Sequence, residues 1–155
     1  MAERVLPKVI GAEAEPRDMP LIAAALAAEG LRGIDLPART LLFVFREPGG
    51  GTIGFAGLEP LGEAALLRSL VVLPPARARA QGSAIVAWMA EEARRRGIAE
   101  IFLLTTTAAP FFEKLGFRRI ARDAVPPSVA ASPEFTTLCP NNAVAMARRL
   151  RPEPG

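Results

Sequence analysis

The stretch that decides the fold is residues 66–97, LLRSLVVLPPARARAQGSAIVAWMAEEARRRG. It begins with an apolar, β-branched run that two prolines end, a pattern typical of a strand covered on both faces. A short turn of small and basic residues follows, ARARAQGS at positions 76–83. From Ser83, the apolar residues Ile85, Trp88 and Met89 recur on one face while charged residues occupy the other. The pattern therefore predicts a strand, a turn and an amphipathic helix that Gly97 ends.

The turn in this stretch has the features of an anion-binding site. The first N–H groups of a helix lack intrahelical partners, and together with the positive end of the helix dipole they favour a phosphate. Arg77 and Arg79 add two positive charges beside them. The alternative is a solvated basic loop that only joins a strand to a helix, and both interpretations stay open on the physics of the turn alone.

The bulk composition indicates one globular domain. The chain has 155 residues, 50% of them hydrophobic, which is enough for one full core and too little for two. The formal net charge is only +3, there is no tyrosine, and aromatic residues make up 6%, so a surface for stacking bases is not expected. We therefore expect a protein that does not bind nucleic acid.

Two residue types exclude further chemistry. The chain has no histidine, which removes histidine triads, histidine general bases and histidine metal ligands. Its one cysteine, Cys139, cannot form an internal disulfide or a cysteine-rich zinc site, so no metal is expected. No stretch resembles a signal peptide or reaches the length of a membrane span. A cytoplasmic protein that does not enter the membrane is the expectation.

The remaining pattern predicts an alternation of strands and helices along the whole chain. We expect strands at residues 5–10, 40–46, 52–59, 66–73, 99–105, 117–122 and 143–150, and helices at residues 18–29, 83–96 and 108–115. Asp18 is expected to cap the first helix, and residues 60–62 to form a turn. Residues 143–150 alternate like a strand, although their propensity equally allows a helix. The order β-α-β-β-β-α-β-α-β-β predicts an α/β fold, with one mixed sheet covered by helices on both faces and parallel strands around the central helix.

This order and two motifs resemble the GNAT N-acetyltransferases, over roughly residues 1–122. The segment RARAQG at positions 77–82 is similar to the family fingerprint Gln/Arg-x-x-Gly-x-Gly/Ala, with Ala80 in place of the first glycine. Alanine disfavours a positive φ, so it fits there if the turn is an ordinary start of a helix. The segment FFEKLGF at positions 111–117 resembles the Tyr-x-Lys-x-Gly-Phe element, with Phe112 at the usual tyrosine and Thr105 where asparagine is common. The resemblance implies one acetyltransferase domain over residues 1–151, with a flexible tail at residues 152–155.

Four segments narrow the resemblance to the N-acetyltransferases encoded in arsenic-resistance operons. They are GLEP at positions 57–60, LLRSL at 66–70, LLTTT at 103–107 and EFTTLCP at 134–140. Relatives of that kind acetylate amino-acid antibiotics such as phosphinothricin and its arsenic analogue. The resemblance thus implies a role in arsenical or antibiotic resistance and leaves the acceptor of this chain undefined.

The family resemblance also implies where acetyl-CoA, the co-substrate, is bound. Its pyrophosphate would sit over the turn, its pantetheine amides would pair with backbone like an added strand, and a backbone N–H there would polarise the thioester carbonyl. The residues implied are Arg77, Arg79, Ala80, Gln81, Gly82 and Ser83 for the phosphates, Leu70, Val71 and Val72 for the pantetheine, and Thr105 and Phe112 for the rest of the cofactor.

The sequence offers few residues for general acid–base catalysis. Phe112 cannot supply the proton that the usual tyrosine gives, but general acid catalysis is worth only about 10²–10⁴-fold, so its loss slows the reaction without forbidding it. Water, Ser69 or Thr107 are weak substitutes. Glu59 is the candidate base, and its alternative is a solvated carboxylate before a turn at Pro60. An α-amine is partly neutral near pH 7, unlike lysine, so a small amino-acid-like acceptor fits better than protein lysine.

The proline-rich residues 123–142 form a stretch too long for a simple connector. We expect it to fold over the acceptor site. Arg68 and Arg122 would hold a substrate carboxylate or phosphinate by bidentate contacts, and neutral hydrogen bonds would come from Thr136, Thr137 and Asn142. The alternative is a surface excursion with one buried anchor, Phe135, and arginines in ordinary ion pairs.

Three functions stay open. The first is an acetyl-CoA-dependent N-acetyltransferase that acts on a small-molecule amine by direct attack. The second is a non-catalytic acyl-CoA sensor, for which Ala80 and Phe112 argue. The third is a protein N-acetyltransferase, which needs an open groove rather than a closed pocket lined by arginine. A homodimer is common in the family that the chain resembles.

Overall fold

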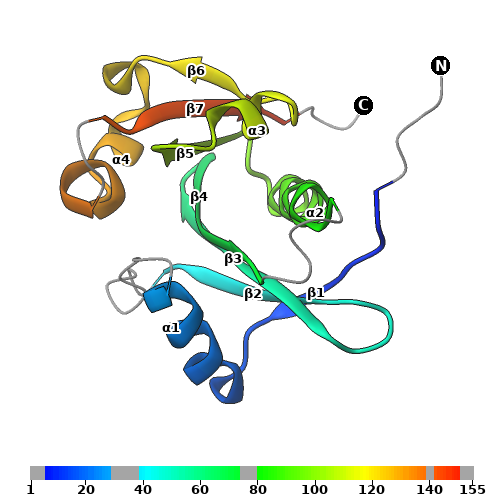
Figure 1. Ribbon diagram of the computed structural model, residues 1–155. Coiled ribbons are helices and arrows are strands. Elements are labelled where there is room, and N and C mark those ends of the chain that lie inside the picture. Colours follow the sequence, from blue (N-terminus) through cyan, green and yellow to red (C-terminus); the bar gives the residue numbers. More distant parts are fainter. Residues whose placement is uncertain (1–5, 29–38, 74–79, 139–141, 151–155) are drawn as a thin grey trace, which may run out of the picture. The chain divides into compact units, whose positions relative to one another are not determined.

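The structure, a computed structural model, describes residues 6–28, 39–73, 80–138 and 142–150 (Figure 1). Its strands are β1 (Ile10–Glu13), β2 (Leu41–Arg46), β3 (Thr52–Leu61), β4 (Ala64–Val72), β5 (Glu100–Thr105), β6 (Arg118–Ile120) and β7 (Val144–Arg149). Its helices are η1 (Pro16–Asp18), α1 (Met19–Ala28), α2 (Gln81–Arg95), α3 (Ala109–Glu113), η4 (Arg122–Ala124), α4 (Pro127–Ala130) and η5 (Glu134–Leu138). The seven strands form one sheet in the order β1-β2-β3-β4-β5-β7-β6.

The sheet is mixed, as the sequence predicts. The strands that flank α2, β4 and β5, pair in parallel, whereas β5 and β7 pair antiparallel. By its contacts, the chain forms two compact units, one of Met1–Gly57 with Ser69–Met89 and the other of Leu58–Arg68 with Ala90–Gly155. The strands β3 and β4 and the helix α2 contribute residues to both. A single domain over residues 1–151 stays a prediction.

The core of the first unit forms between α1 and the strands. Ile22 and Leu26 of α1 pack with Val44, Phe55 and Val71. On α2, the ring of Trp88 lies 5.3 Å from that of Phe43 and 5.2 Å from that of Phe45, measured between centroids. Burial of large apolar side chains of this kind stabilises the unit far more than the weak helix propensity of individual residues does.

The first strand is one position where the sequence prediction is wrong. It was expected at residues 5–10, but β1 spans Ile10–Glu13 and pairs with β2 from Ile10↔Arg46 to Glu13↔Phe43. A Cβ added at Gly11 would lie 2.6 Å from Cε2 of Trp88, so this backbone passes close to the indole and only glycine fits. Tertiary packing against Trp88 therefore sets the strand, and the local apolar pattern does not.

The second unit has a core of its own around η5 and α4. Phe135 of η5 and Val129 of α4 pack with Leu66, Phe102 and Val125. In the sheet, β7 lies between β5 and β6, and it pairs antiparallel with both (Figure 1). This pairing decides the ambiguity of residues 143–150 in favour of a strand.

Two turns also differ from expectation. The strand β3 continues through Pro60 to Leu61, and the hairpin turns at Gly62 and Glu63, because Gly62 supplies the positive φ of 74° that the tight turn requires. Asp18 does not cap α1. Its carboxylate accepts the backbone N–H of Glu15 at 2.8 Å, which closes the preceding turn η1 instead.

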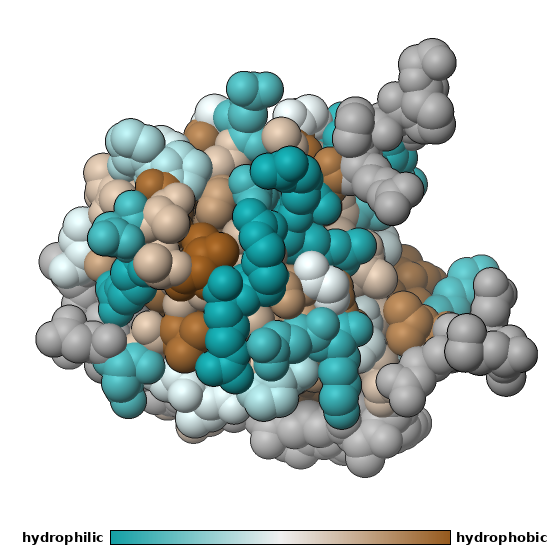
Figure 2. Space-filling model, turned by 90° about the horizontal axis from the view of Figure 1, so that it is seen from above, coloured by the Kyte–Doolittle hydropathy of each residue, from teal (hydrophilic) through white to brown (hydrophobic). Residues whose placement is uncertain are grey.

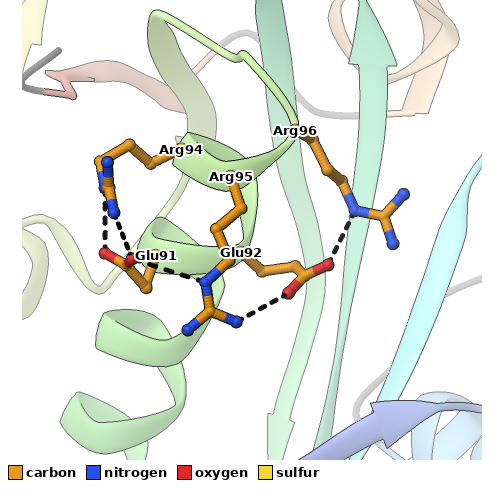
Figure 3. A network of polar contacts seen from close by, with 5 residues as sticks. All are labelled: Glu91, Glu92, Arg94, Arg95 and Arg96. Atoms are coloured by element: carbon orange, nitrogen blue, oxygen red, sulfur yellow. Dashed lines mark hydrogen bonds and ion pairs between the residues drawn. The ribbon is translucent and has the colours of Figure 1, made fainter. Parts of the chain in front are cut away.

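The surface carries mixed charge. On the face that Figure 2 shows, hydrophobic residues form small patches between hydrophilic side chains. At the C-terminal end of α2, a network of ion pairs joins Glu91, Glu92, Arg94, Arg95 and Arg96 (Figure 3). None of the helices in the described part of the chain is long and apolar enough to cross a membrane.

Candidate active site

The start of α2, in the first unit, is the candidate site for the cofactor. Ala84 donates its N–H to the Ala80 carbonyl at 3.3 Å, the first backbone hydrogen bond of the helix. The N–H groups of Gln81, Gly82 and Ser83 precede that bond, so the helix itself offers them no acceptor. They point with the positive end of the helix dipole toward whatever lies before the helix.

The backbone at Ala80 departs from an ordinary start of a helix. This exposed alanine has a φ of +59°, the left-handed conformation that glycine adopts easily and alanine does not. The condition under which alanine would fit without strain, an ordinary start of a helix, is therefore not met. Alanine here adopts a left-handed backbone conformation, at some cost in strain.

A buried side chain fixes this turn. Gln81 is only 4% exposed, and its Nε2 donates to Oε1 of Glu47, just after β2, at 3.2 Å. Gly82 and Ser83 are half-buried, with their backbone at the first turn of α2. This arrangement fits a phosphate of CoA, which would accept hydrogen bonds from Gln81, Gly82 and Ser83. Arg77 and Arg79, predicted to assist, lie outside the described residues, as does Cys139.

The strand β4 is interrupted in its middle. Ser69 has a φ of +58°, so the peptide groups on either side of it do not continue the regular strand. The parallel pairing with β5 covers three residue pairs among the described residues, from Ala64↔Glu100 to Leu66↔Phe102, although β4 continues to Val72. Leu70, Val71 and Val72, predicted to pair with the pantetheine, follow this interruption, and that role stays a prediction.

The predicted cofactor residues Thr105 and Phe112 have clear structural roles. Thr105 ends β5, and its Oγ1 accepts the Ala108 N–H at 3.0 Å, which holds the turn into α3. Phe112 is buried and packs edge-on against Phe111, 5.0 Å away, and Phe117, 5.5 Å away. The position of the family's tyrosine is thus apolar here, and no hydroxyl is available at it.

A separate candidate site is a buried cluster of charges in the second unit, formed by Glu59, Arg68 and Glu134. Glu59 of β3 is 0% exposed and Arg68 of β4 is 5% exposed. The Arg68 Nη1 donates to Oε1 of Glu59 at 3.0 Å, and its Nη2 lies 3.2 Å from Oε1 of Glu134 on η5. The hairpin between β3 and β4 brings the first two together, and charges buried this deeply are tolerated only when paired. The alternative of a solvated Glu59 is therefore wrong.

Two other residues predicted to bind the acceptor are Arg122 and Thr136. Arg122 contacts Phe135, the residue after Glu134, and Thr136 follows Phe135 in the chain. Arg122 donates from Nη2 to the Phe135 carbonyl at 3.0 Å, and its Cζ lies 5.8 Å from the centroid of the Phe135 ring. Thr136 donates from Oγ1 to the Ser132 carbonyl at 3.1 Å. The side chain of Thr137 lies outside the described residues.

The stretch at residues 123–142 is more ordered than a surface excursion with one anchor. It contains α4 and η5 and buries Val125 and Val129 as well as Phe135. The alternative that Phe135 is its one buried anchor is therefore wrong. Glu134 was not among the residues predicted from the sequence. Its position next to the predicted anchor Phe135 was a signal, but no local pattern links it to Arg68.

The comparisons with known proteins decide the family. The sequence matches the acetyltransferase (GNAT) domain over residues 38–119, more than half of the chain. The chain belongs to the GNAT family of acetyltransferases. A search of curated protein sequences finds no match.

Solved structures show the same fold. N-acetylglutamate synthase from Neisseria gonorrhoeae, in complex with coenzyme A and N-acetyl-glutamate, superposes with a TM-score of 0.76 at 22% identity, covering 97% of this chain. This chain spans only 36% of that protein. The ribosomal-protein-S18-alanine N-acetyltransferase from Escherichia coli has a TM-score of 0.67 at 20% identity, with 96% of this chain and 97% of that one covered. A Mycobacterium tuberculosis protein in complex with CoA has a TM-score of 0.75 at 22% identity, with 92% and 99% covered.

The family match confirms the predicted fold and the predicted acetyltransferase (GNAT) domain. Acetyl-CoA as co-substrate agrees with the coenzyme A present in several of the similar structures. The relation to arsenic-resistance operons and the roles of individual site residues stay predictions.

Proposed function

We propose that the protein transfers an acetyl group from acetyl-CoA to the amine of a small amino-acid-like molecule. The observation that carries this proposal is the buried Glu59–Arg68 pair, which sets a guanidinium beside a carboxylate within one unit. A guanidinium recognises a carboxylate, and a carboxylate accepts a proton from an amine. An amino acid offers both groups on one carbon.

In the proposed reaction, acetyl-CoA supplies an activated acetyl thioester. The amine nitrogen bonds to the acetyl carbon, the carbon–sulfur bond breaks, and CoA leaves as thiolate. The proton lost by the amine goes to Glu59, directly or through a water. Arg68 orients the acceptor, and Arg122 and Thr136 belong to the same acceptor side. Backbone N–H groups at the start of α2 bind the pyrophosphate, and Leu70, Val71 and Val72 align the pantetheine.

Phe112 favours a second candidate function, a non-catalytic acyl-CoA sensor. A buried phenylalanine, packed between Phe111 and Phe117, cannot protonate the leaving thiolate. An ordinary thiol has a pKa near 8.5 and leaves as thiolate at a useful rate, so the absence of an acid does not forbid turnover. The enzyme is the better supported candidate because Glu59 offers a base.

The test is release of CoA from acetyl-CoA with a panel of amines: free amino acids, phosphinothricin and its arsenic analogue, and a lysine peptide. We expect an amino-acid-like amine to raise the rate well above the background. Binding of acetyl-CoA without release by any amine would support the sensor. Faster turnover on the lysine peptide than on every small amine would overturn the proposed acceptor class in favour of a protein N-acetyltransferase.

The resistance role, a cytoplasmic location and a homodimer complete the proposal. The four segments similar to the arsenic-operon enzymes support the first. Expression of the protein in a sensitive bacterium should raise the tolerated concentration of phosphinothricin or its arsenic analogue, whereas the Glu59→Gln variant should not. Unchanged tolerance with active enzyme in the lysate would separate the resistance role from the activity.

A further inference from the structure

The charged cluster contains an unused hydrogen-bond donor. Arg68 gives Nη1 to Glu59 and Nη2 to Glu134, but its Nε, which is buried, has no hydrogen-bond partner among the described residues. Buried donors are nearly always satisfied in folded proteins, so an exception asks for an explanation. The unsatisfied donor belongs to Arg68, which the proposed function already assigns to acceptor binding.

The geometry of a guanidinium makes this unused donor informative. The Nε–H and one Nη2–H lie side by side on one edge of the planar group, and a carboxylate bound there takes two parallel hydrogen bonds. Glu134 reaches only Nη2 of that edge, through Oε1 at 3.2 Å. Of the two nitrogens on this edge, Nη2 is paired and Nε is not. A carboxylate that bound both nitrogens would therefore bind Arg68 more strongly than Glu134 does.

Of the two carboxylates on Arg68, Glu134 is the one suited to leave. The Glu59 side chain is 0% exposed and comes from β3, inside the sheet. The Glu134 side chain is 15% exposed and comes from η5, a single turn of π-helix, a geometry often found at functional sites. The neighbouring Phe135 holds η5 in the core, with its carbonyl bound by Arg122. Only the Glu134 side chain has to rotate.

We propose that Glu134 reserves the carboxylate position on Arg68 and selects acceptors that carry a carboxylate. In the free protein it pairs with Nη2, and the acceptor's carboxylate replaces it by binding Nε and Nη2 together. Arg68 then still lies between two carboxylates, so its buried charge stays paired while the Glu134 side chain rotates toward solvent. An amine without a carboxylate cannot make the exchange and does not gain entry to Arg68. This inference rests on the proposed function, because it assigns the acceptor class of the same site.

The experiment is titration calorimetry of the full chain in the presence of CoA. The ligands are the amino acids of the panel, phosphinothricin, and the matching amines that lack the α-carboxylate. Glu134→Gln removes the competing charge at the same size, and we expect it to bind carboxylate ligands about 5–10-fold more tightly, close to one decade of equilibrium constant. The amines without a carboxylate should bind both proteins equally weakly.

Glu113→Gln is the matched control, because Glu113 pairs with the exposed Arg119 at 3.1 Å in the same unit and loses the same charge. It should bind like the parent protein, which excludes a general effect of net charge. If Glu134→Gln does not fold, Glu134→Asp, whose shorter carboxylate withdraws from Arg68, should tighten binding in the same direction.

Three results would overturn the inference: weaker binding by the Glu134 variants, equal changes for ligands with and without a carboxylate, or no carboxylate binding to any form. Calorimetry does not depend on turnover. Tighter carboxylate binding without acetylation would thus uphold the role of Glu134 while the proposed enzymatic function fails.

Discussion

The two candidate sites, one in each unit, are built from different parts of the chain. The proposed cofactor site is mainly backbone: the N–H groups at the start of α2, and a strand β4 whose path bends at Ser69. The proposed acceptor site is made of charged side chains, with Arg68 between Glu59 and Glu134. A backbone site needs only a conformation, whereas a side-chain site needs particular residues.

This difference explains how the chain departs from the family pattern. Ala80 stands where the family pattern has a glycine and adopts a φ of +59°, so this conformation does not require a glycine. The buried charges tolerate substitution less well, because replacing Arg68 removes the ion pair that it makes with Glu59 in the protein interior. We expect cofactor binding to tolerate substitution and acceptor recognition to depend on individual side chains.

The largest expected effect is on catalysis, from Glu59→Gln. The amide keeps the shape and a hydrogen bond to Arg68 but accepts no proton from the amine. We expect kcat for an amino-acid acceptor to fall by about 10²–10⁴-fold, with CoA affinity unchanged by calorimetry. Glu63→Gln, at the exposed turn of the same hairpin, should keep full activity. A kcat within a few-fold of the parent value would show that Glu59 only supports the fold.

The next effect is on stability, from Arg68→Leu. Removing the guanidinium leaves Glu59 and Glu134 without their buried counter-charge, and breaking a buried pair in this way costs about 3–5 kcal/mol. The free energy of unfolding in urea measures this loss. Arg119→Leu, at an exposed pair with Glu113, should cost about 0–1 kcal/mol. Equal losses of unfolding free energy in the two variants would show that the buried ion pairs of Arg68 stabilise the fold no more than the exposed pair of Arg119.

A smaller effect with the opposite sign is expected from Ala80→Gly. Glycine relieves the left-handed strain at this position but increases the freedom of the unfolded chain, so we expect a gain of about 0.5–1 kcal/mol in unfolding free energy. Affinity for CoA should stay equal or rise. The matched control is Ala87→Gly on the exposed face of α2, which should cost about 1 kcal/mol. A loss at both positions would mean that the turn at Ala80 relaxes to an ordinary helix start in solution.

The sequence predicted the order of elements because each has a strong local signal. The apolar run of β4, the small residues of the turn and the helical spacing of Ile85 and Met89 all act within a few residues. The position of β1 could not be read in this way, since it depends on the close approach of Gly11 to Trp88, far along the chain. The tertiary contact overrode the local pattern.

The candidate site was predicted unevenly for the same reason. Glu59 and Arg68 were identified separately, but no spacing rule pairs them across a hairpin whose turn was placed two residues too early. Glu134 was missed because its partner comes from β4, distant in sequence. The conformation of Ala80 could not be predicted either, because alanine disfavours a positive φ and no local pattern shows that the side chain of Gln81 is bound by Glu47.

The smallest effect on stability is expected from the exposed ion pairs at the end of α2. They serve as a comparison for the buried cluster of Glu59, Arg68 and Glu134. The hydrogen bond from Arg94 lowers the pKa of Glu91 below its ordinary value of 4.5. A lowered pKa in the folded state means that the ionised form stabilises the fold above the ordinary value, and that this contribution is lost as the pH falls through the lowered one. Glu91→Gln should therefore reduce Tm slightly at pH 7 and not at all at a pH well below 4.5.

High salt separates this exposed network from the buried cluster in the same measurement. The Glu91 side chain is 44% exposed, so 1 M salt at pH 7 should remove most of the difference between Glu91→Gln and the parent protein. The difference caused by Arg68→Leu should persist in that salt, because buried charges are screened little. A salt-resistant effect at Glu91 would mean that its pairs with Arg94 and Arg95 are held rigidly, and that exposure alone does not separate the two kinds of ion pair in this protein.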